Sequence, residues 1–442
     1  MQNTKVVFLI IESISREYHS RIFLANLLIR QGYSVIIGGK GIVHLTSIIK
    51  GKKYVLHKDP VFSSSKLIEL SKSNGCVVDV IDEEGLMLQS DDVYVNQRLS
   101  LETLKNVDTV LCWGRYQERL INNKYPGIST NIVGNPRMDV LKYSGDKFIA
   151  DKKLNNIILI NTKLGQYNHK NGSEYYVNSI KDNYNITDKN VLEFRRKNQL
   201  YVKKLFFSYI DLINKISQKF PNNIIVLRPH PSESKQTWER MVKNLNNVIV
   251  TQRGSIAEWL KISKCVVHTG CSTALEARIS NVPAISFEPF VKDGALFDDM
   301  LGNEISYRCY TISEVLSAID GALKSTIKIN NYEDFVSDYL YLGKKKSSEL
   351  IVEHINSMID NSDNFQTTSG GRFILIKLSI FSYLRTLNQF FKKIIKAPSG
   401  NIVWLRKNKV REEFFRVNNA EDIDIVVTKI YGGVVSINKK KT

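Results

Sequence analysis

The architecture follows from two stretches, Ile224-Ile225-Val226-Leu227-Arg228-Pro229-His230-Pro231 and Val266-Val267-His268-Thr269-Gly270-Cys271-Ser272-Thr273-Ala274-Leu275-Glu276-Ala277. In each, an apolar run typical of a buried parallel strand leads into a polar or small-residue loop. The second loop also opens a helix. We expect both loops at the carboxyl ends of neighbouring parallel strands, where open α/β sheets bind their ligands.

The length and charge of the chain limit what it can be. Its 442 residues exceed one ordinary core, so we expect two domains with extra segments. A net charge of +18 predicts an anionic partner: nucleic acid, a membrane surface or a phosphorylated substrate. The five cysteines lack CxxC or metal-ligand spacing, which is typical of a reduced, cytosolic protein. No apolar run suits a signal peptide or a spanning helix, and no nucleic-acid-binding signature is present.

The first domain, residues 1–144, opens with a βαβ pattern. Residues 5–11 and 33–37 are typical strands, joined by a helix that ends at Gly32. We expect a polar loop at residues 12–20, which contains Arg16 and His19. Glycines follow the second strand instead of the first, which argues against a dinucleotide fingerprint and an NAD site.

A run of acidic residues follows a later strand of the first domain. Residues 76–81 form an apolar strand that leads into Asp82-Glu83-Glu84-Gly85. Mutual repulsion among three consecutive carboxylates is expected to raise at least one of their pKa values toward neutrality. Such a group can act as a general base. A solvated acidic turn would give the same pattern.

The second domain, residues 151–330, contains the candidate phosphate site. A strand at 156–160 leads into Asn161-Thr162, and the two stretches quoted above supply the other loops. Gly270 allows close approach of a ligand to the backbone. Ser272 or Thr273 can cap the following helix, and Thr273 and Glu276 have capping-box spacing. Free N–H groups and the helix dipole would then favour a phosphate.

Charged side chains beside these loops suit a departing phosphate. His230 lies between Pro229 and Pro231 and can donate a hydrogen bond or a proton, while Arg228 adds positive charge. Glu276 can alternatively accept hydrogen bonds from ribose hydroxyls. A histidine after a strand is also commonly structural, so the prediction depends on the combination of these residues.

We expect no metal ion and no separate cofactor. Asp422-Ile423-Asp424 has DxD spacing but lies in the tail, and the pairs Asp91-Asp92 and Asp298-Asp299 are typical of solvated positions. Positive charge from His230, Arg228 and the helix terminus would replace a divalent ion.

The end of the chain has a different composition. Residues 331–361 are predicted to be a helical return segment, followed by a polar linker from 362. Residues 372–442 form a basic extension, in which 372–411 have ten basic residues, no acid and interleaved Leu, Ile and Phe. This pattern favours contact with an anionic membrane face. A helix packed on the main body with its basic residues in water would also have this composition.

Three short motifs, Glu83-Glu84-Gly85, His230-Pro231 and Ser272-Thr273, occur in this order. In these motifs the chain resembles bacterial surface-carbohydrate biosynthesis proteins of the glycosyltransferase B-type fold, and it is similar to the CMP-sugar-dependent sialyl and Kdo transferases. The resemblance implies two Rossmann-like domains, with the acceptor bound by the first and the nucleotide-sugar donor by the second. It also implies inversion at the anomeric carbon without a metal.

The resemblance assigns roles to individual residues. An acid of the first motif would be the base; Asp82, Glu83 and Glu84 are all candidates, and we prefer Glu83. His230 would contact the CMP phosphate, and Ser272 and Thr273 would hold phosphate or cytidine. With Glu83, Glu84 and His230 as catalytic residues, the candidate substrate-binding residues are Asp82, Gly85, Arg16, His19, Asn161, Thr162, Arg228, Pro231, Gly270, Cys271, Ser272, Thr273 and Glu276.

The leading hypothesis is transfer of an ulosonic acid, such as Kdo or sialic acid, from a CMP donor to a glycan or lipid-linked acceptor of a capsule or lipopolysaccharide. The enzyme would lie in the cytoplasm, peripheral on the inner face of the membrane through 372–411. Arg-Pro-His-Pro also occurs in proteins resembling teichoic-acid polyol-phosphate transferases, which use CDP-polyols; His19 would then be the second histidine expected near the acceptor. The sequence is also compatible with a nucleotide-sugar epimerase or with a non-catalytic scaffold that binds membranes or glycans.

Overall fold

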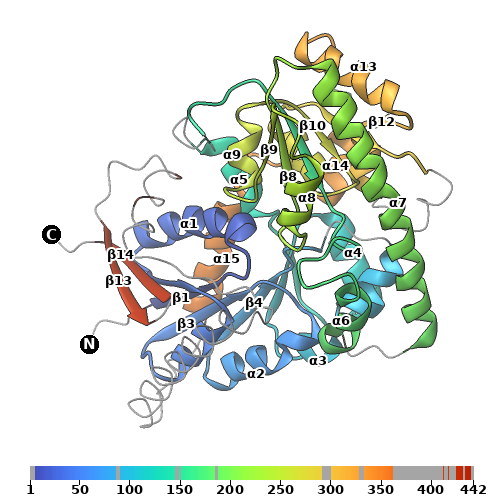
Figure 1. The fold of residues 1–442 in the computed structure, drawn as a ribbon. Coiled ribbons are helices and arrows are strands. Elements are labelled where there is room, and N and C mark those ends of the chain that lie inside the picture. The colour runs from blue at the N-terminus through green and yellow to red at the C-terminus, as the bar shows by residue number, and fades with distance from the viewer. Residues whose placement is uncertain are drawn as a thin grey trace. The chain divides into compact units, whose positions relative to one another are not determined.

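The computed structural model describes residues 5–85, 90–144, 149, 151–184, 188–290, 300–327, 333–361, 412, 417, 425–431 and 434–439. The chain divides into two compact units. Unit 1 comprises Met1–Gly85, Val95–Phe148 and Phe335–Thr442, and unit 2 comprises Leu86–Tyr94 and Ile149–Asp334. Each unit contains one sheet (Figure 1).

Unit 1 is built on an eight-stranded sheet with the order β13-β14-β2-β1-β3-β4-β5-β6. The strands from β2 to β6 in this order are parallel, and the β13–β14 hairpin is antiparallel at the β2 edge. The bounds are β1 Lys5–Ile10, β2 Ser34–Gly38, β3 Lys52–His57, β4 Val77–Ile81, β5 Thr109–Cys112, β6 Thr130–Ile132, β13 Ile425–Tyr431 and β14 Val434–Lys439.

Helices cover the sheet of unit 1 because its central strands are apolar on both faces. Val6, Phe8 and Ile10 of β1 pack with Ile42 of η1 and Ile68 of α2 in one core cluster. Helix α1 contacts α5 and α15, so the chain returns to this unit after leaving unit 2. The bounds are α1 Ile14–Arg30, η1 Lys40–Ser47, η2 Phe62–Ser64, α2 Ser65–Ser73, η3 Val93–Arg98, α3 Leu101–Leu104, α4 Arg115–Lys124, α5 Pro136–Tyr143, α14 Glu333–Tyr339 and α15 Ser347–Asp360.

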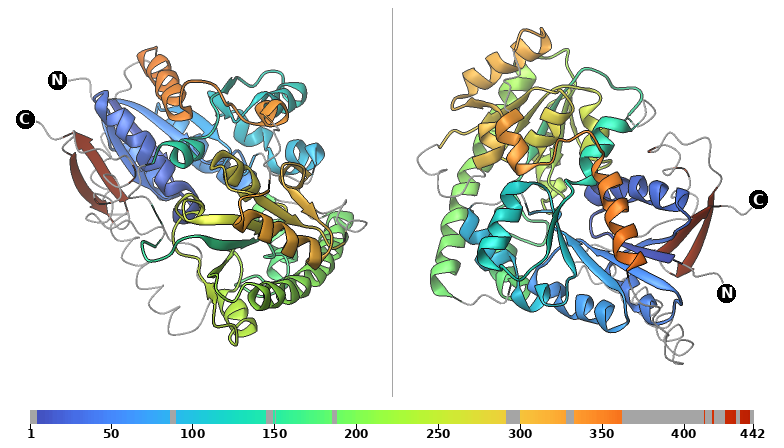
Figure 2. Two further views of the ribbon diagram at one scale, coloured as in Figure 1. Left: turned by 90° about the horizontal axis from the view of Figure 1, so that it is seen from above. Right: turned by 180° about the vertical axis from the view of Figure 1, so that it is seen from behind.

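Unit 2 has a six-stranded parallel sheet with the order β12-β11-β10-β7-β8-β9. Figure 2 shows the ribbon of this unit, coloured from green to orange, from two further directions. Its bounds are β7 Ile157–Thr162, β8 Ile225–Pro229, β9 Val248–Val250, β10 Ser263–His268, β11 Ala284–Phe287 and β12 Tyr307–Cys309. The helices are α6 Tyr175–Tyr184, α7 Lys189–Lys219, α8 Lys235–Met241, α9 Ile256–Leu260, α10 Thr273–Ile279, α12 Met300–Glu304 and α13 Ile312–Leu323. Tyr209 of α7, Trp238 of α8 and Val315 of α13 share one core cluster with the strands.

The predicted α/β class with two Rossmann-like units is confirmed, and one detail of the sheet is wrong. Strands β8 and β10, which we expected to be neighbours, lie on either side of β7. Because β7 comes first in unit 2, later strands are added on both sides of it. The loops after β8 and β10 therefore lie at the same sheet edge, with the end of β7 between them.

Three local features also differ from the sequence analysis. The expected loop at 12–20 is helical from Ile14, because the Glu17 carboxylate accepts a hydrogen bond from the backbone N–H of Glu12 at 2.7 Å, close to the helix start. Strand β3 was not predicted: it begins with two lysines, of which Lys53 is buried and donates to the carbonyl of Thr46 at 2.8 Å. Residues Tyr175–Tyr184 form α6, a helix that the sequence analysis does not predict.

The tail is described in part. Residues 425–431 and 434–439 contribute the antiparallel strands β13 and β14, of which β14 pairs with β2. The basic stretch 372–411, Asp422, Asp424 and the pair Asp298-Asp299 lie outside the described residues. Among the helices that the structure describes, none has both the length and the apolar character needed to cross a bilayer.

Candidate functional site

The acidic turn follows β4, as the sequence predicts, and each of its carboxylates has an arginine partner. The Asp82 carboxylate is buried and accepts two hydrogen bonds from Arg98, from Nε at 2.7 Å and from Nη2 at 2.5 Å. The indole N–H of Trp113 donates to the Asp82 carbonyl at 2.8 Å. A Cβ at Gly85 would meet the Asp82 side chain, so glycine closes the turn.

Glu83 is enclosed within unit 1. Its side chain is 1% exposed and lies 2.9 Å from Nη2 of Arg21, whose own side chain is fully buried on α1. The backbone N–H of Glu83 donates to the Lys58 carbonyl at 3.0 Å, and Asn135 Nδ2 donates to Glu83 Oε2 at 3.4 Å. Glu83 is therefore part of a buried ion pair that joins β4 to α1.

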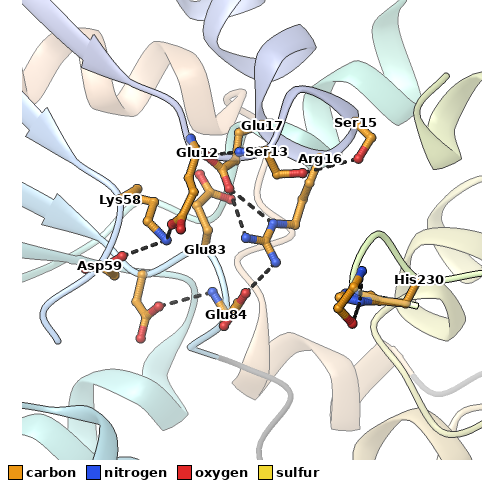
Figure 3. Close-up of polar contacts among 12 residues, drawn as sticks. Glu12, Ser13, Ser15, Arg16, Glu17, Lys58, Asp59, Glu83, Glu84 and His230 are labelled. Atoms are coloured by element: carbon orange, nitrogen blue, oxygen red, sulfur yellow. Dashed lines mark hydrogen bonds and ion pairs between the residues drawn. The ribbon is translucent and has the colours of Figure 1, made fainter. Parts of the chain in front are cut away.

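Glu84 is the exposed member of the turn, with 46% of its side chain accessible. Arg16 Nη1 donates to one carboxylate oxygen at 2.6 Å (Figure 3). Arg98 Nη1 donates to the other oxygen at 3.2 Å. Loss of water favours the neutral acid, but the charges of Arg16, Arg98 and Lys58 outweigh it and hold the pKa of Glu84 well below its ordinary value. The expected upward shift from mutual repulsion is thus wrong for Glu84.

The ends of β1 and β3 add charged residues that the sequence did not single out. Lys58 pairs with Asp59 at 2.7 Å and also contacts Glu12 (Figure 3). Burial opposes these charges, yet the pairing raises the pKa of Lys58 and lowers that of Asp59. Recognition of β3 would have placed Lys58 and Asp59 beside the acidic turn. His19, expected on a loop, lies on α1 and is 9% exposed.

In unit 2, His230 follows β8 with a defined orientation. The backbone N–H of Ser232 donates to His230 Nδ1 at 3.2 Å, and the Ser232 hydroxyl lies 2.7 Å from the same nitrogen. Since Nδ1 accepts, the neutral imidazole carries its proton on Nε2. The His230 side chain is exposed at the carboxyl edge of the sheet.

A buried carboxylate, Glu233, clamps the loop that carries His230. Its Oε1 accepts from the backbone N–H groups of His230 and Leu164, each at 3.0 Å, and from the Thr162 hydroxyl at 2.8 Å. Its Oε2 accepts from the Trp238 indole at 2.8 Å. Burial raises the pKa of Glu233, while these donors oppose the shift. Glu233 therefore joins the loops after β7 and β8, a role that spacing alone did not reveal.

Arg228 occupies a different position from the one expected. Its side chain is buried, and Nη2 donates to the carbonyl of Gly254 at 2.7 Å. Burial lowers its pKa, although the charges of Glu276 and Glu258 act in the opposite direction. Arg228 is thus buried near the end of β8 and lies in the field of Glu276, which is itself 2% exposed.

The loop after β10 depends on a positive backbone angle and a neutral histidine. Gly270 has φ of +61°, and a Cβ there would meet Asn303 Oδ1 at 2.9 Å. Its N–H donates to His268 Nδ1 at 3.0 Å, while His268 Nε2 lies 2.8 Å from the Ser306 hydroxyl. Burial lowers the pKa of His268 to about 3.

The start of α10 differs from the predicted cap. Ser272 occupies the N-cap position with helical angles and makes no side-chain cap bond, so the predicted serine cap and the Thr273–Glu276 capping box are both absent. Instead, the Thr273 hydroxyl accepts a hydrogen bond from Asn161 Nδ2 at 2.9 Å, which joins the ends of β7 and β10. Cys271 is partly exposed, and burial raises its thiol pKa.

The predicted residues of unit 2 therefore gather at one sheet edge. Asn161 and Thr162 end β7, Pro231 follows β8, and Gly270 to Thr273 follow β10. In unit 1, Arg16 joins Glu84, while Asp82 and Glu83 pair with other arginines. Across the described ranges, no group of three or more His, Cys, Asp or Glu side chains is arranged to hold a metal ion.

Comparison with known proteins defines the fold class. No protein-family model and no curated protein matches this chain. The wall teichoic acid polymerase TagF is similar in structure, with 10% identity, a TM-score of 0.51 and coverage of 81% of this chain and 90% of that one. The UDP-GlcNAc 2-epimerase of Methanocaldococcus jannaschii has 14% identity, a TM-score of 0.49, and coverage of 80% of this chain and 99% of that one. S. aureus MnaA in complex with UDP has 12% identity, a TM-score of 0.48, and coverage of 81% of this chain and 97% of that one. The likeness to TagF establishes the two-unit fold of the glycosyltransferase B type.

Proposed function

We propose that this chain is an inverting, metal-independent glycosyltransferase that moves an ulosonic acid from a CMP donor onto a bacterial surface polysaccharide. The observation that carries the proposal is the orientation of His230. Ser232 fixes its tautomer, Glu233 fixes its backbone, and the side chain is exposed at the sheet edge that the loops after β7 and β10 share. A fixed donor of this kind stabilises charge that develops on a departing phosphate.

The donor would be bound by unit 2. His230 would donate to the phosphate as the bond to the sugar breaks, and the backbone and hydroxyls at Gly270, Ser272 and Thr273 would surround the phosphate or cytidine. Arg228 is buried, so we assign it to holding the loops and the Glu276 carboxylate in place and not to direct phosphate contact. The donor is a substrate, and the proposal includes no other cofactor.

The base would come from unit 1. Among the three acids of the turn, Glu84 is 46% exposed, whereas the Glu83 side chain is 1% exposed and paired with Arg21. We therefore assign acceptor deprotonation to Glu84 and keep Glu83, the first choice from sequence, as its buried support. The low pKa keeps the Glu84 carboxylate charged at neutral pH, so it can accept the proton, as a weaker base than a group with a pKa near the operating pH. Direct attack by this hydroxyl would invert the anomeric carbon.

The test is turnover with a panel of CMP-, CDP-, UDP- and GDP-activated donors, with and without a chelator. Release of CMP together with an acceptor product of inverted configuration, observed by NMR, is the expected result. Turnover restricted to UDP or GDP sugars would eliminate the CMP assignment. Retention of configuration would eliminate direct displacement, and loss of activity with the chelator would contradict metal independence.

A second candidate is a CDP-polyol phosphotransferase of the teichoic-acid type. The Arg-Pro-His-Pro sequence at the end of β8 favours it, and His19 would be the second histidine. His19 is 9% exposed on α1, so an acceptor would reach it only after movement of its neighbours. Turnover of CDP-glycerol with release of CMP would support this candidate, and a free altered sugar formed without acceptor would indicate an epimerase. Location at the inner face of the cytoplasmic membrane through 372–411 remains part of the leading proposal.

A further inference from the structure

The long helix α7 of unit 2 has an unusual outward face. It is the 31-residue helix Lys189–Lys219, drawn in green in Figure 1. Its exposed positions between 196 and 207 follow the spacing of one helical stripe and are Arg196, Lys197, Leu200, Lys203, Lys204 and Phe207. We call these six residues the α7 stripe.

The opposite face of α7 is fully used by the fold. Tyr201, Leu205 and Tyr209 belong to the core cluster of unit 2. One flank is covered by α6, because Arg195 donates to the Tyr176 carbonyl at 2.8 Å and Asn198 donates to the Tyr176 hydroxyl at 3.0 Å. The packing therefore fixes which face of α7 points outward.

The α7 stripe combines positive charge with exposed apolar side chains. Leu200 is 61% exposed and Phe207 is 50% exposed, although a solvated helix face is ordinarily polar. Four basic residues accompany them, and the sequence has no acid between residues 194 and 210. Glu193 pairs with Lys197 at 3.0 Å at one end, but both side chains are more than 60% exposed, so water screens this pair.

We propose that the α7 stripe docks on an anionic lipid bilayer, with its basic residues at the headgroups and Leu200 and Phe207 inserted at the acyl boundary. Two turns of helix separate these apolar residues, so both reach the same plane when the helix lies flat. Clustered lysine and arginine complement the negative surface of such a membrane. A nucleic acid or an acidic polymer would match the charge but would offer no apolar medium for a leucine and a phenylalanine. The proposal is independent of the reaction proposed above and of residues 372–411.

The first experiment reports on contact at the stripe itself. Leu200→Cys in the full chain is labelled with the environment-sensitive dye NBD, and vesicles of phosphatidylethanolamine and phosphatidylglycerol in equal parts are added. Leu101→Cys is the control, because Leu101 is 48% exposed on α3 of unit 1. The unsubstituted chain, labelled in parallel, gives the background from Cys271, which is partly exposed. We expect a blue-shifted, brighter emission at 200, no change at 101, and no change at either position with phosphatidylcholine alone.

The second experiment measures vesicle affinity by cosedimentation. Leu200→Ser with Phe207→Ser, and separately Lys203→Glu with Lys204→Glu, should each lower the affinity by about tenfold. Leu101→Ser is the apolar control. Lys105→Glu with Lys124→Glu is the charge control, since both lysines are exposed in unit 1. The controls should retain the affinity of the unsubstituted chain.

Several results would overturn the proposal. One is unchanged NBD emission at position 200 under conditions in which the chain cosediments with the anionic vesicles. Others are the absence of any cosedimentation, or an equal loss of affinity in the controls. Binding to dextran sulfate that depends on Lys203 and Lys204, with no dye response to vesicles, would assign the stripe to an acidic polymer instead.

Discussion

Replacing Arg21 by Met should strongly destabilise unit 1. The Arg21 side chain is fully buried and the Glu83 side chain is 1% exposed, with 2.9 Å between Nη2 and Oε1. Without the guanidinium, the Glu83 carboxylate would be left charged and unpaired in the interior. Breaking a buried pair in this way costs about 3–5 kcal/mol in the free energy of unfolding. Methionine fills much of the arginine volume, so most of the loss would come from the uncompensated charge.

The measurement is urea unfolding of four proteins: the unsubstituted chain, Arg21→Met, Glu83→Gln and the double variant. Hydrogen exchange then shows whether the lost stability belongs to unit 1. The double variant should be less destabilised than the sum of the single variants, because it leaves no buried charge. Arg119→Met is the matched control: Arg119 and its partner Asp338 are 56% and 28% exposed, so its loss should be about 0–1 kcal/mol. Equal, small effects of Arg21→Met and Arg119→Met would refute the reasoning.

Three further predictions concern unit 2. His230→Ala should remove one charge-stabilising donor and with it about 3 kcal/mol of transition-state stabilisation, which lowers turnover roughly 150-fold. A loss below tenfold in steady-state assays would contradict this prediction. Glu233→Gln should cost about 1–3 kcal/mol of stability because its amide NH2 would face a donor, and should lower kcat as well. Glu239→Gln is its control, because the Glu239 side chain is exposed on α8. Equal melting temperatures and equal kcat values for Glu233→Gln and Glu239→Gln would contradict the role of Glu233 in holding the loops. Finally, the pKa of His268 is about 3 when folded against 6.5 ordinarily. As the pH falls below about 6.5, the His268 imidazole takes up a proton in the unfolded chain but not in the folded one. The free energy of unfolding should therefore drop by about 1.4 kcal/mol per pH unit, down to about pH 3. Equal urea midpoints at pH 7 and pH 5 would contradict this prediction.

The sequence predicts the strands and the edge of the sheet well because both depend on local pattern. Apolar runs such as 5–11 and 224–228 are typical of buried parallel strands, and the polar residues that follow must lie at the carboxyl edge. Strand β3 is missed because Lys53 interrupts its apolar pattern, and the Lys53 amine is satisfied by the carbonyls of residues 46 and 74, which are distant in sequence.

The site is predicted less completely because its pairings join distant parts of the chain. Repulsion within Asp82-Glu83-Glu84 dominates when only chain neighbours are considered, whereas Arg16 reaches Glu84 from 68 positions away. Glu233 shows the same limit: its partners at the end of β7 lie about seventy residues earlier. Only the fold brings these charges together, so the chemistry of the acids could not be predicted from spacing.

The most direct test of the central claim is a crystal structure of the chain with CMP. We predict the phosphate within hydrogen-bonding distance of His230 Nε2, beside Ser272 and Thr273, with the cytosine ring held by unit 2. A phosphate bound away from His230, or a site that takes UDP or GDP and leaves CMP unbound, would contradict the account.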